Sequence, residues 1–186
     1  MAFIFSIEKE SLKRKFAVYV VIAKADMDVR LYVGKTGDNR EGCNPLISRC
    51  GNHFSYNEVH SQIRNKLEGH EERDYTYVFD HFDEYTADKA LRLESVACIN
   101  EMERWLNEEI QAMCSEFDSV RLLNPYTGVG FVRQEERTKR RTFRTDENRE
   151  KINGIVSAVR TTISVRSSNG IYSSTALRNP DVRVQT

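Results

Sequence analysis

A glutamate in the middle of an apolar helical stripe is the most informative feature of the sequence. A long helix is predicted from about residue 87, with Thr86 as its cap. At 100° per residue six side chains fall within one stripe: Ala87, Ala90, Leu91, Cys98, Met102 and Trp105. Glu94 lies in the middle of this stripe, and an ionised carboxylate on a buried face costs several kcal/mol unless it is paired, hydrogen-bonded or bound to a metal. Glu94 is therefore the candidate metal ligand, with Glu101 as the competing candidate and a position at the rim of the helix as the structural alternative.

An arginine and a histidine come four residues apart in a second predicted helix. Asn44-Pro45 is typical of an N-cap followed by proline at the first helical position. A short helix through about residue 53 would place Arg49 and His53 on one face. Each residue alone has an ordinary interpretation, an ion-paired arginine or a histidine beside a helix end. Only their combination with other polar residues points to a site.

Two predicted strands position a tyrosine each. Residues 16–23 and 29–34 are rich in Val, Ile and aromatic residues and are expected to pair antiparallel through a polar connection. Strand alternation predicts two faces of the first strand: Phe16, Val18, Val20 and Ile22 on one, and Ala17, Tyr19 and Val21 on the other. Tyr32 lies on the second strand. Taken singly, such tyrosines are more often ordinary strand aromatics than functional groups.

The remaining pattern completes an α+β fold. Residues 57–67 predict a helix that ends at Gly69, and residues 75–82 alternate as a third strand. We therefore expect a small antiparallel three-stranded sheet flanked by helices. Turn residues at 121–130 would close this domain, so the first domain is predicted to span residues 1–130.

The charge of the chain is segregated although its net charge is zero. From residue 131 onward there are 12 Lys or Arg and 6 Asp or Glu, whereas the first 130 residues contain 16 basic and 22 acidic residues. Residues 131–186 are thus predicted to be a basic C-terminal extension, with a small helix at 152–165 and a flexible end. A basic extension on an acidic domain favours a polyanionic partner, and a solvated tail is the alternative.

Composition argues against several other classes of protein. No apolar run approaches the roughly 20 residues that a membrane span needs, and the start of the chain lacks the order of a secretory signal. The four cysteines show no CxxC spacing, so neither a zinc site nor a disulfide framework is expected. The expected compartment is the cytoplasm.

The order of these motifs resembles the GIY-YIG nuclease superfamily. Ala17-Val18-Tyr19 stands where the family has Gly-Ile-Tyr, and Tyr32-Val33-Gly34 stands where it has Tyr-Ile-Gly, followed directly by Lys35. Arg49-Cys50-Gly51-Asn52-His53 matches the Arg-x3-His element of restriction-type members. The resemblance covers residues 15–130, and five elements in the right order make it more specific than any single motif.

Two further motifs complete the resemblance, and a third segment matches a family motif only by chance. Residues 90–94 are similar to the family's apolar helix that carries the metal glutamate, and Leu123-Asn124-Pro125 is similar to its terminal asparagine element. The interval from Glu94 to Asn124 is 30 residues, longer than in compact members. Gly170-Ile171-Tyr172 spells the first motif literally, but no other motif follows it.

The resemblance implies a metal-dependent DNA endonuclease of restriction, mobile-element or phage type. Glu94 would bind one Mg²⁺ or Mn²⁺, and Tyr19 would act as the general base under the influence of the neighbouring cations Lys35 and Arg49. Arg49 would also contact the scissile phosphate, since its planar fork suits that group. His53 would relay the proton, and Tyr32 would position the water or the phosphate.

The resemblance and the charge pattern also suggest substrate contacts. Gly34 would let the backbone approach the DNA, and Asn124 would lie beside it. The basic stretch would bind phosphates of double-stranded DNA, through Arg133, Lys139, Arg140 and Arg141. Cleavage of both strands at a palindrome would favour a homodimer.

Two other functions fit the same residues. One is a catalytically inactive DNA-binding or regulatory protein that kept the nuclease fold, and the other is a nuclease for RNA or branched DNA. The retained Tyr19, Arg49 and Glu94 favour an enzyme over an inactive relative.

Overall fold

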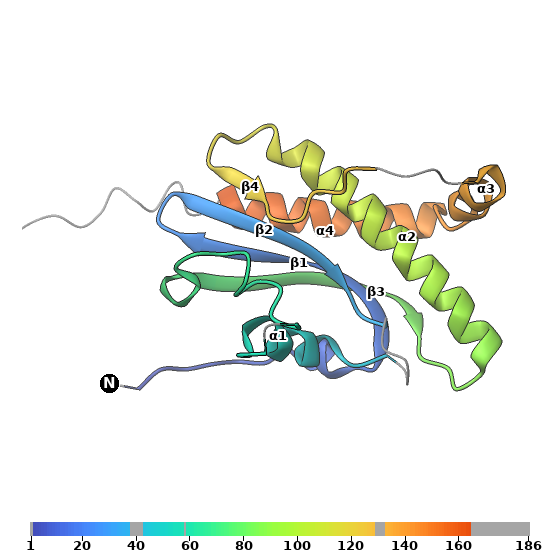
Figure 1. Ribbon diagram of the computed structural model, residues 1–186, viewed down its shortest axis with the longest axis horizontal. Coiled ribbons are helices and arrows are strands. Elements are labelled where there is room, and N and C mark those ends of the chain that lie inside the picture. The colour runs from blue at the N-terminus through green and yellow to red at the C-terminus, as the bar shows by residue number, and fades with distance from the viewer. Residues whose placement is uncertain (1, 38–42, 58, 129–132, 165–186) are drawn as a thin grey trace, which may run out of the picture.

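The apolar run that begins at Phe16 forms one of the two inner strands of a four-stranded sheet in the computed structural model (Figure 1). The structure describes residues 2–37, 43–57, 59–128 and 133–164. Its elements follow in this order: η1 (Lys9–Leu12), β1 (Lys15–Ala25), β2 (Asp28–Lys35), α1 (Leu46–Phe54), η2 (His70–Glu72), β3 (Asp74–Glu84), α2 (Lys89–Cys114), β4 (Val120–Leu122), α3 (Gln134–Thr142) and α4 (Asp146–Ser164).

The sheet has the order β3-β1-β2-β4 and is mixed. β1 pairs antiparallel with both β2 and β3, but β4 pairs parallel with β2. The predicted α+β class is confirmed, and the predicted three-stranded antiparallel sheet is wrong. The added strand has only three residues, so it is too short to leave a period-two pattern in the sequence.

The predicted alternation of β1 is confirmed. Phe16, Val18, Val20 and Ile22 belong to the main hydrophobic core, whereas Tyr19, Val21 and Ala23 belong to a smaller core on the opposite face. The helices α2 and α4 cover the first face and α1 lies on the second (Figure 1). Burial on both sides explains why the strand is almost continuously apolar.

The segment 57–67 does not form the predicted helix. Val59 N donates to Asn57 Oδ1 at 3.0 Å, and Ser61 Oγ donates to the Asn57 carbonyl at 2.5 Å. These bonds between side chains and nearby backbone compete with helical hydrogen bonds, and the segment forms successive turns instead. Ile63 and Leu67 still pack into the smaller core.

The long helix begins two residues later than predicted; Met102 and Trp105 of the predicted stripe are buried, but the first turns of the helix are exposed. Asp88, not Thr86, is its cap, because its carboxylate accepts from two backbone N–H groups in the first turn. Leu91 is 57% exposed. The face that packs on the sheet instead begins one turn later: Ser95, Ile99, Met102, Leu106, Ile110 and Met113.

The last described helix contributes to the main core. Ile152, Ile155, Val159 and Ile163 of α4 are buried together with β1 and α2. This part of the predicted C-terminal extension therefore shares one core with the predicted first domain. The end of the chain predicted to be flexible, and the chance match at 170–172, lie outside the described residues. Among the described helices, none combines the length and the apolar character that crossing a bilayer requires.

Candidate active site

A polar pocket of about 340 Å³ opens beside the last residues of β2. β4 pairs with β2 only at Val29–Leu31, so within the described residues no strand follows along the rest of this edge. Side chains from β1, β2, α1 and α2 can therefore meet there. The residues that could do chemistry in this pocket are Tyr19, Tyr32, Lys35, Arg49, His53 and Glu103.

The Tyr19 side chain lies over Gly34 of the neighbouring strand β2. Tyr19 pairs in register with Gly34 of β2, and its side chain is only 2% exposed. A Cβ atom at position 34 would lie 2.5 Å from the Tyr19 hydroxyl. Gly34 is thus required because the phenol occupies the space that a side chain would fill. Gly34 also lines the pocket, so the approach of DNA to its backbone stays a prediction.

Tyr19, His53 and Tyr77 form a chain of hydrogen bonds. The Tyr19 hydroxyl lies 3.0 Å from His53 Nε2, and the Tyr77 hydroxyl lies 3.0 Å from His53 Nδ1. The Tyr77 hydroxyl is in turn hydrogen-bonded with the Cys50 thiol. A neutral imidazole donates from one ring nitrogen and accepts at the other, so one phenol donates to His53 and the other accepts from it.

Burial sets the protonation states of His53 and Tyr19. Burial, and then the positive charge of Arg49, lower the pKa of His53 from 6.5 to about 4. The imidazole is therefore neutral at physiological pH. Burial raises the pKa of Tyr19 well above its usual value, the nearby Tyr32 adds to this rise, and Arg49 opposes it. Both groups are therefore neutral at physiological pH, and burial moves their pKa values apart, so a transfer of a proton from Tyr19 to His53 is uphill in the empty pocket. The expectation that neighbouring cations lower the pKa of Tyr19 is wrong here, because burial outweighs Arg49.

Glu103 supplies the carboxylate of the pocket. It lies one residue after the buried Met102 of α2, and its Oε2 is 2.6 Å from Lys35 Nζ. The side chain of Lys35 is 17% exposed and that of Glu103 is 29% exposed. This ion pair is partly shielded from water and holds the carboxylate at the mouth of the pocket.

The two glutamates considered from the sequence lie elsewhere. The expectation that Glu94 occupies a buried stripe is wrong, because it is exposed in the first turns of α2 and does not line the pocket. Those turns carry exposed residues on every side, so their apolar residues do not mark the core face. Glu101 is buried, but its carboxylate is paired with Arg104 and Arg144.

Asn124 holds the edge of β2 and does not line the pocket beside the end of that strand. Its Oδ1 accepts from Val33 N at 3.1 Å and its Nδ2 donates to Val33 O at 2.8 Å. The amide thereby takes the place of a strand beyond the end of β4. Asn107 of α2 donates to the Asn124 carbonyl at 2.8 Å, so the loop is tied to both elements.

The basic residues predicted to bind substrate divide into two groups. Lys139 and Arg140 line a second hollow, which Glu103 also lines. Arg133 and Arg141 are exposed and line none of the pockets described here.

Sequence reasoning missed Glu103 and Tyr77. The interval from Glu103 to Asn124 is 21 residues, shorter than the 30 that separate Glu94 from Asn124, and the length of that interval was the available signal. Tyr77 faces the same side of the sheet as Tyr19 but comes from a strand that carried no motif. His60, which had no predicted role, also lines the pocket, with Asn52 and Gln62.

The donor set fits a hard divalent cation bound through one protein carboxylate. Mg²⁺ usually keeps several waters and takes one or two carboxylates together with substrate phosphates. Glu103 is the carboxylate available for this, and binding would require Lys35 to release it. Among the described residues no three His, Cys, Asp or Glu side chains gather into a protein-supplied metal cage.

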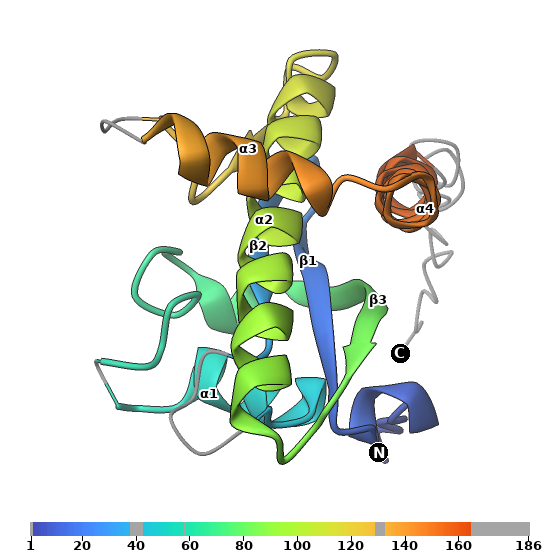
Figure 2. The same ribbon diagram turned by 90° about the vertical axis from the view of Figure 1, so that its right-hand side faces the viewer.

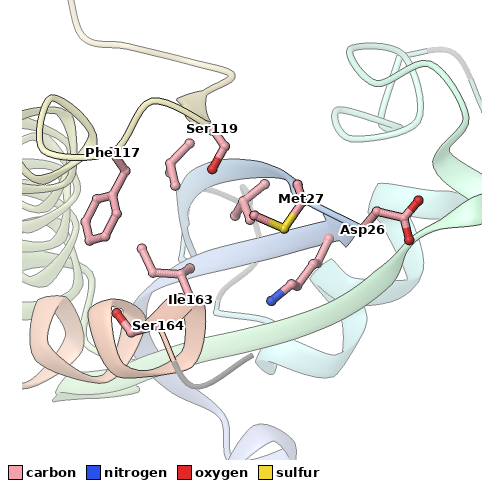
Figure 3. A pocket seen from close by; sticks show the side chains of 9 residues that line it. Asp26, Met27, Phe117, Ser119, Ile163 and Ser164 are labelled. Atoms are coloured by element: carbon pink, nitrogen blue, oxygen red, sulfur yellow. The ribbon is translucent and has the colours of Figure 1, made fainter. Parts of the chain in front are cut away.

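Another hollow, of about 310 Å³, lies at the far end of the sheet (Figure 3). It lies between the turn at Asp26 and Met27 and the end of α4 at Ile163 and Ser164. Its charged residues are Lys24 and Asp26, with no histidine, tyrosine or arginine beside them. This set cannot bind a phosphate through a guanidinium and deprotonate water at the same time, so the pocket beside β2 is the candidate active site.

Replacing Gly34 with alanine should destabilise the fold by about 1–3 kcal/mol, because the new methyl group overlaps the Tyr19 ring. Gly51→Ala in α1 is the matched control, since nothing lies within 4 Å of its Cβ position. That substitution should stabilise the protein by roughly 0.5–1 kcal/mol through helix propensity. Urea unfolding measures both changes, and equal stability of the two variants would contradict the packing described.

Acidification should destabilise the protein through His53. As the pH falls through 6.5 the unfolded chain takes up a proton, but the buried ring does not until the pH reaches about 4. The contribution of neutral His53 to the free energy of unfolding is present above pH 6.5 and is lost as the pH falls toward 4, a decrease of about 3 kcal/mol. Urea unfolding between neutral pH and pH 4 measures it. His53→Gln should flatten the profile, and an equally steep profile in that variant would assign the effect to other groups.

Comparison with protein-family models, with curated proteins and with solved structures finds no match to this chain.

Proposed function

We propose that the chain is a metal-dependent endonuclease of the GIY-YIG type that hydrolyses phosphodiester bonds in double-stranded DNA. One observation carries this proposal. A phenol hydrogen-bonded to a neutral imidazole, a guanidinium, an ammonium group and a carboxylate all face a single pocket of about 340 Å³. Four separate elements supply them, which matches the division of motifs expected from the sequence.

The cations would orient the phosphate. Arg49 and Lys35 lie on the wall of the pocket, and both are suited to the nonbridging oxygens of a phosphodiester. Tyr32 lies next to them, with its ring 5.3 Å from that of His53, and would position the attacking water. A divalent cation on Glu103 would stabilise the charge on the phosphate and on the leaving 3′ oxygen.

The proton path runs inward from the pocket. A water attacks phosphorus, the new P–O bond forms, and the bond from phosphorus to the 3′ oxygen breaks. The water's proton passes to the Tyr19 hydroxyl as the phenol gives its own proton to His53 Nε2. The leaving oxygen takes a proton from solvent. If the Tyr77 hydroxyl donates to the Cys50 thiol, it accepts from His53 Nδ1, and this tautomer leaves Nε2 as the acceptor that the path requires.

Plasmid cleavage tests the proposal. The purified full-length chain is incubated with supercoiled DNA and Mg²⁺ or Mn²⁺, with EDTA as the control. We expect nicked or linear products that carry 5′ phosphates and 3′ hydroxyls, which DNA ligase can rejoin. Intact plasmid across both metals and several plasmid sequences, with DNA retained in a gel shift, would instead support the catalytically inactive binding protein.

A further inference from the structure

Three hollows meet at Glu103. Besides the reaction pocket, this side chain lines a hollow of about 290 Å³ between α2 and α3 and a third of about 240 Å³ near Tyr126. The second and third also share Asn100 and Arg104 of α2. The three hollows therefore adjoin at Glu103, and the second and third offer two routes to a strand whose phosphate lies in the pocket.

The hollow between α2 and α3 is the more basic of the two routes. Figure 2 shows α3 lying across α2, and the pair encloses Arg104, Lys139 and Arg140. Glu136 lines the same hollow and pairs with Arg140 at 3.0 Å. The third hollow has one cation, Arg104, and an aromatic ring, Tyr126, whose centroid lies 5.4 Å from the guanidinium. The hollow between α2 and α3 therefore suits the phosphates of a strand, whereas the hollow near Tyr126 would suit an unstacked base.

We propose that the DNA strand leaves the reaction pocket toward α3, where Lys139 and Arg140 bind the phosphates that flank the scissile bond. This inference rests on the proposed function and adds the direction of the strand. Both side chains line a hollow that adjoins the pocket at Glu103, so a strand whose phosphate lies in the pocket can reach them. Contacts of this kind position the backbone without reading its sequence.

The helix α3 also carries two arginines outside the proposed strand path, which serve as the matched control for Lys139 and Arg140. Arg137 and Arg141 are exposed on α3 and do not line the hollow. A double substitution at these positions changes the net charge of the helix as much as one at Lys139 and Arg140. Comparing the two pairs therefore separates a defined strand path from general attraction between a basic helix and DNA.

The test measures binding of a fluorescein-labelled 20-base-pair duplex to the full-length chain in EDTA, by anisotropy over a range of KCl. Lys139→Gln with Arg140→Gln should lower the slope of log K against log salt by roughly 1.8, since each phosphate contact contributes about 0.9. At about 0.1 M salt this loss should weaken binding by roughly 10- to 100-fold. Arg137→Gln with Arg141→Gln should leave both quantities within about threefold of the parent protein. Circular dichroism verifies that both variants are folded.

Several outcomes overturn the inference. Equal losses in the two double variants would show general electrostatic attraction, and a loss confined to Tyr126→Ala would place the strand on the third route. The proposed function fails separately, if the parent protein binds the duplex but does not cut plasmid with either metal. Absence of binding by the parent protein would overturn both proposals.

Discussion

Glu103→Ala should reduce the rate of plasmid cleavage by roughly 10³-fold or more, whereas Glu94→Ala should cut like the parent protein. Glu103 is the carboxylate that lines the pocket, and its removal would take away the proposed protein ligand to the divalent cation. Glu94 lies nine residues earlier on the same helix, exposed to solvent. The two variants thus compare the same chemical change inside and outside the site.

Metal binding separates this role from a structural one. Titration of each variant with Mn²⁺, followed by electron paramagnetic resonance of the free ion, should show weaker binding only in Glu103→Ala. The variant leaves the Lys35 ammonium without its present partner, so its stability is checked by urea unfolding. Rapid cleavage by Glu103→Ala, or loss of cleavage in Glu94→Ala, would reject the assignment.

Tyr19→Phe should lower the cleavage rate by roughly 10²- to 10⁴-fold, because it removes the hydroxyl that, in the proposed mechanism, carries the proton from water to His53. The ring remains to fill the buried space beside Gly34, so the fold should persist. Binding of DNA in EDTA should be unchanged, since the cations that contact phosphate are intact. Single-turnover cleavage and anisotropy together measure the two quantities.

Tyr77→Phe is the comparison for that prediction. It removes a hydroxyl from the other ring nitrogen of the same histidine, but this hydroxyl is not in contact with the pocket. We expect a loss of roughly tenfold, as for other outer partners of a functional imidazole. The pH dependence of the rate should also change, because the tautomer of His53 is no longer fixed. Equal activity of Tyr19→Phe and Tyr77→Phe would reject a proton path from Tyr19 to His53.

The parts of the site that follow from short-range patterns could be predicted from the sequence. Strand alternation placed Tyr19 on the face opposite Phe16 and Val18, and the structure confirms this placement. The four-residue interval between Arg49 and His53 likewise puts both on the wall of one pocket. These inferences need only the period of a strand or a helix, which the chain cannot alter locally.

The parts that depend on how far an element extends could not be predicted. Choosing Glu94 assumed that the apolar residues of the first turns, such as Leu91, mark the core face, but those turns are exposed. The buried residues of α2 begin at Ser95 and include Met102 and Trp105 of the predicted stripe, and Glu103, next to Met102, lines the pocket. The short strand β4 could not be predicted, because its parallel pairing with β2 joins residues about 90 positions apart.

The buried face of α4 bears on how this protein could be re-engineered. Under the proposed function, a target-recognition segment can be exchanged only where the remaining unit keeps its own hydrophobic core. Here Ile152, Ile155, Val159 and Ile163 are interior residues of that unit, so cutting the chain before α4 would open its main core to water. A chimera should therefore retain the whole of α4 and exchange segments only at exposed positions outside it.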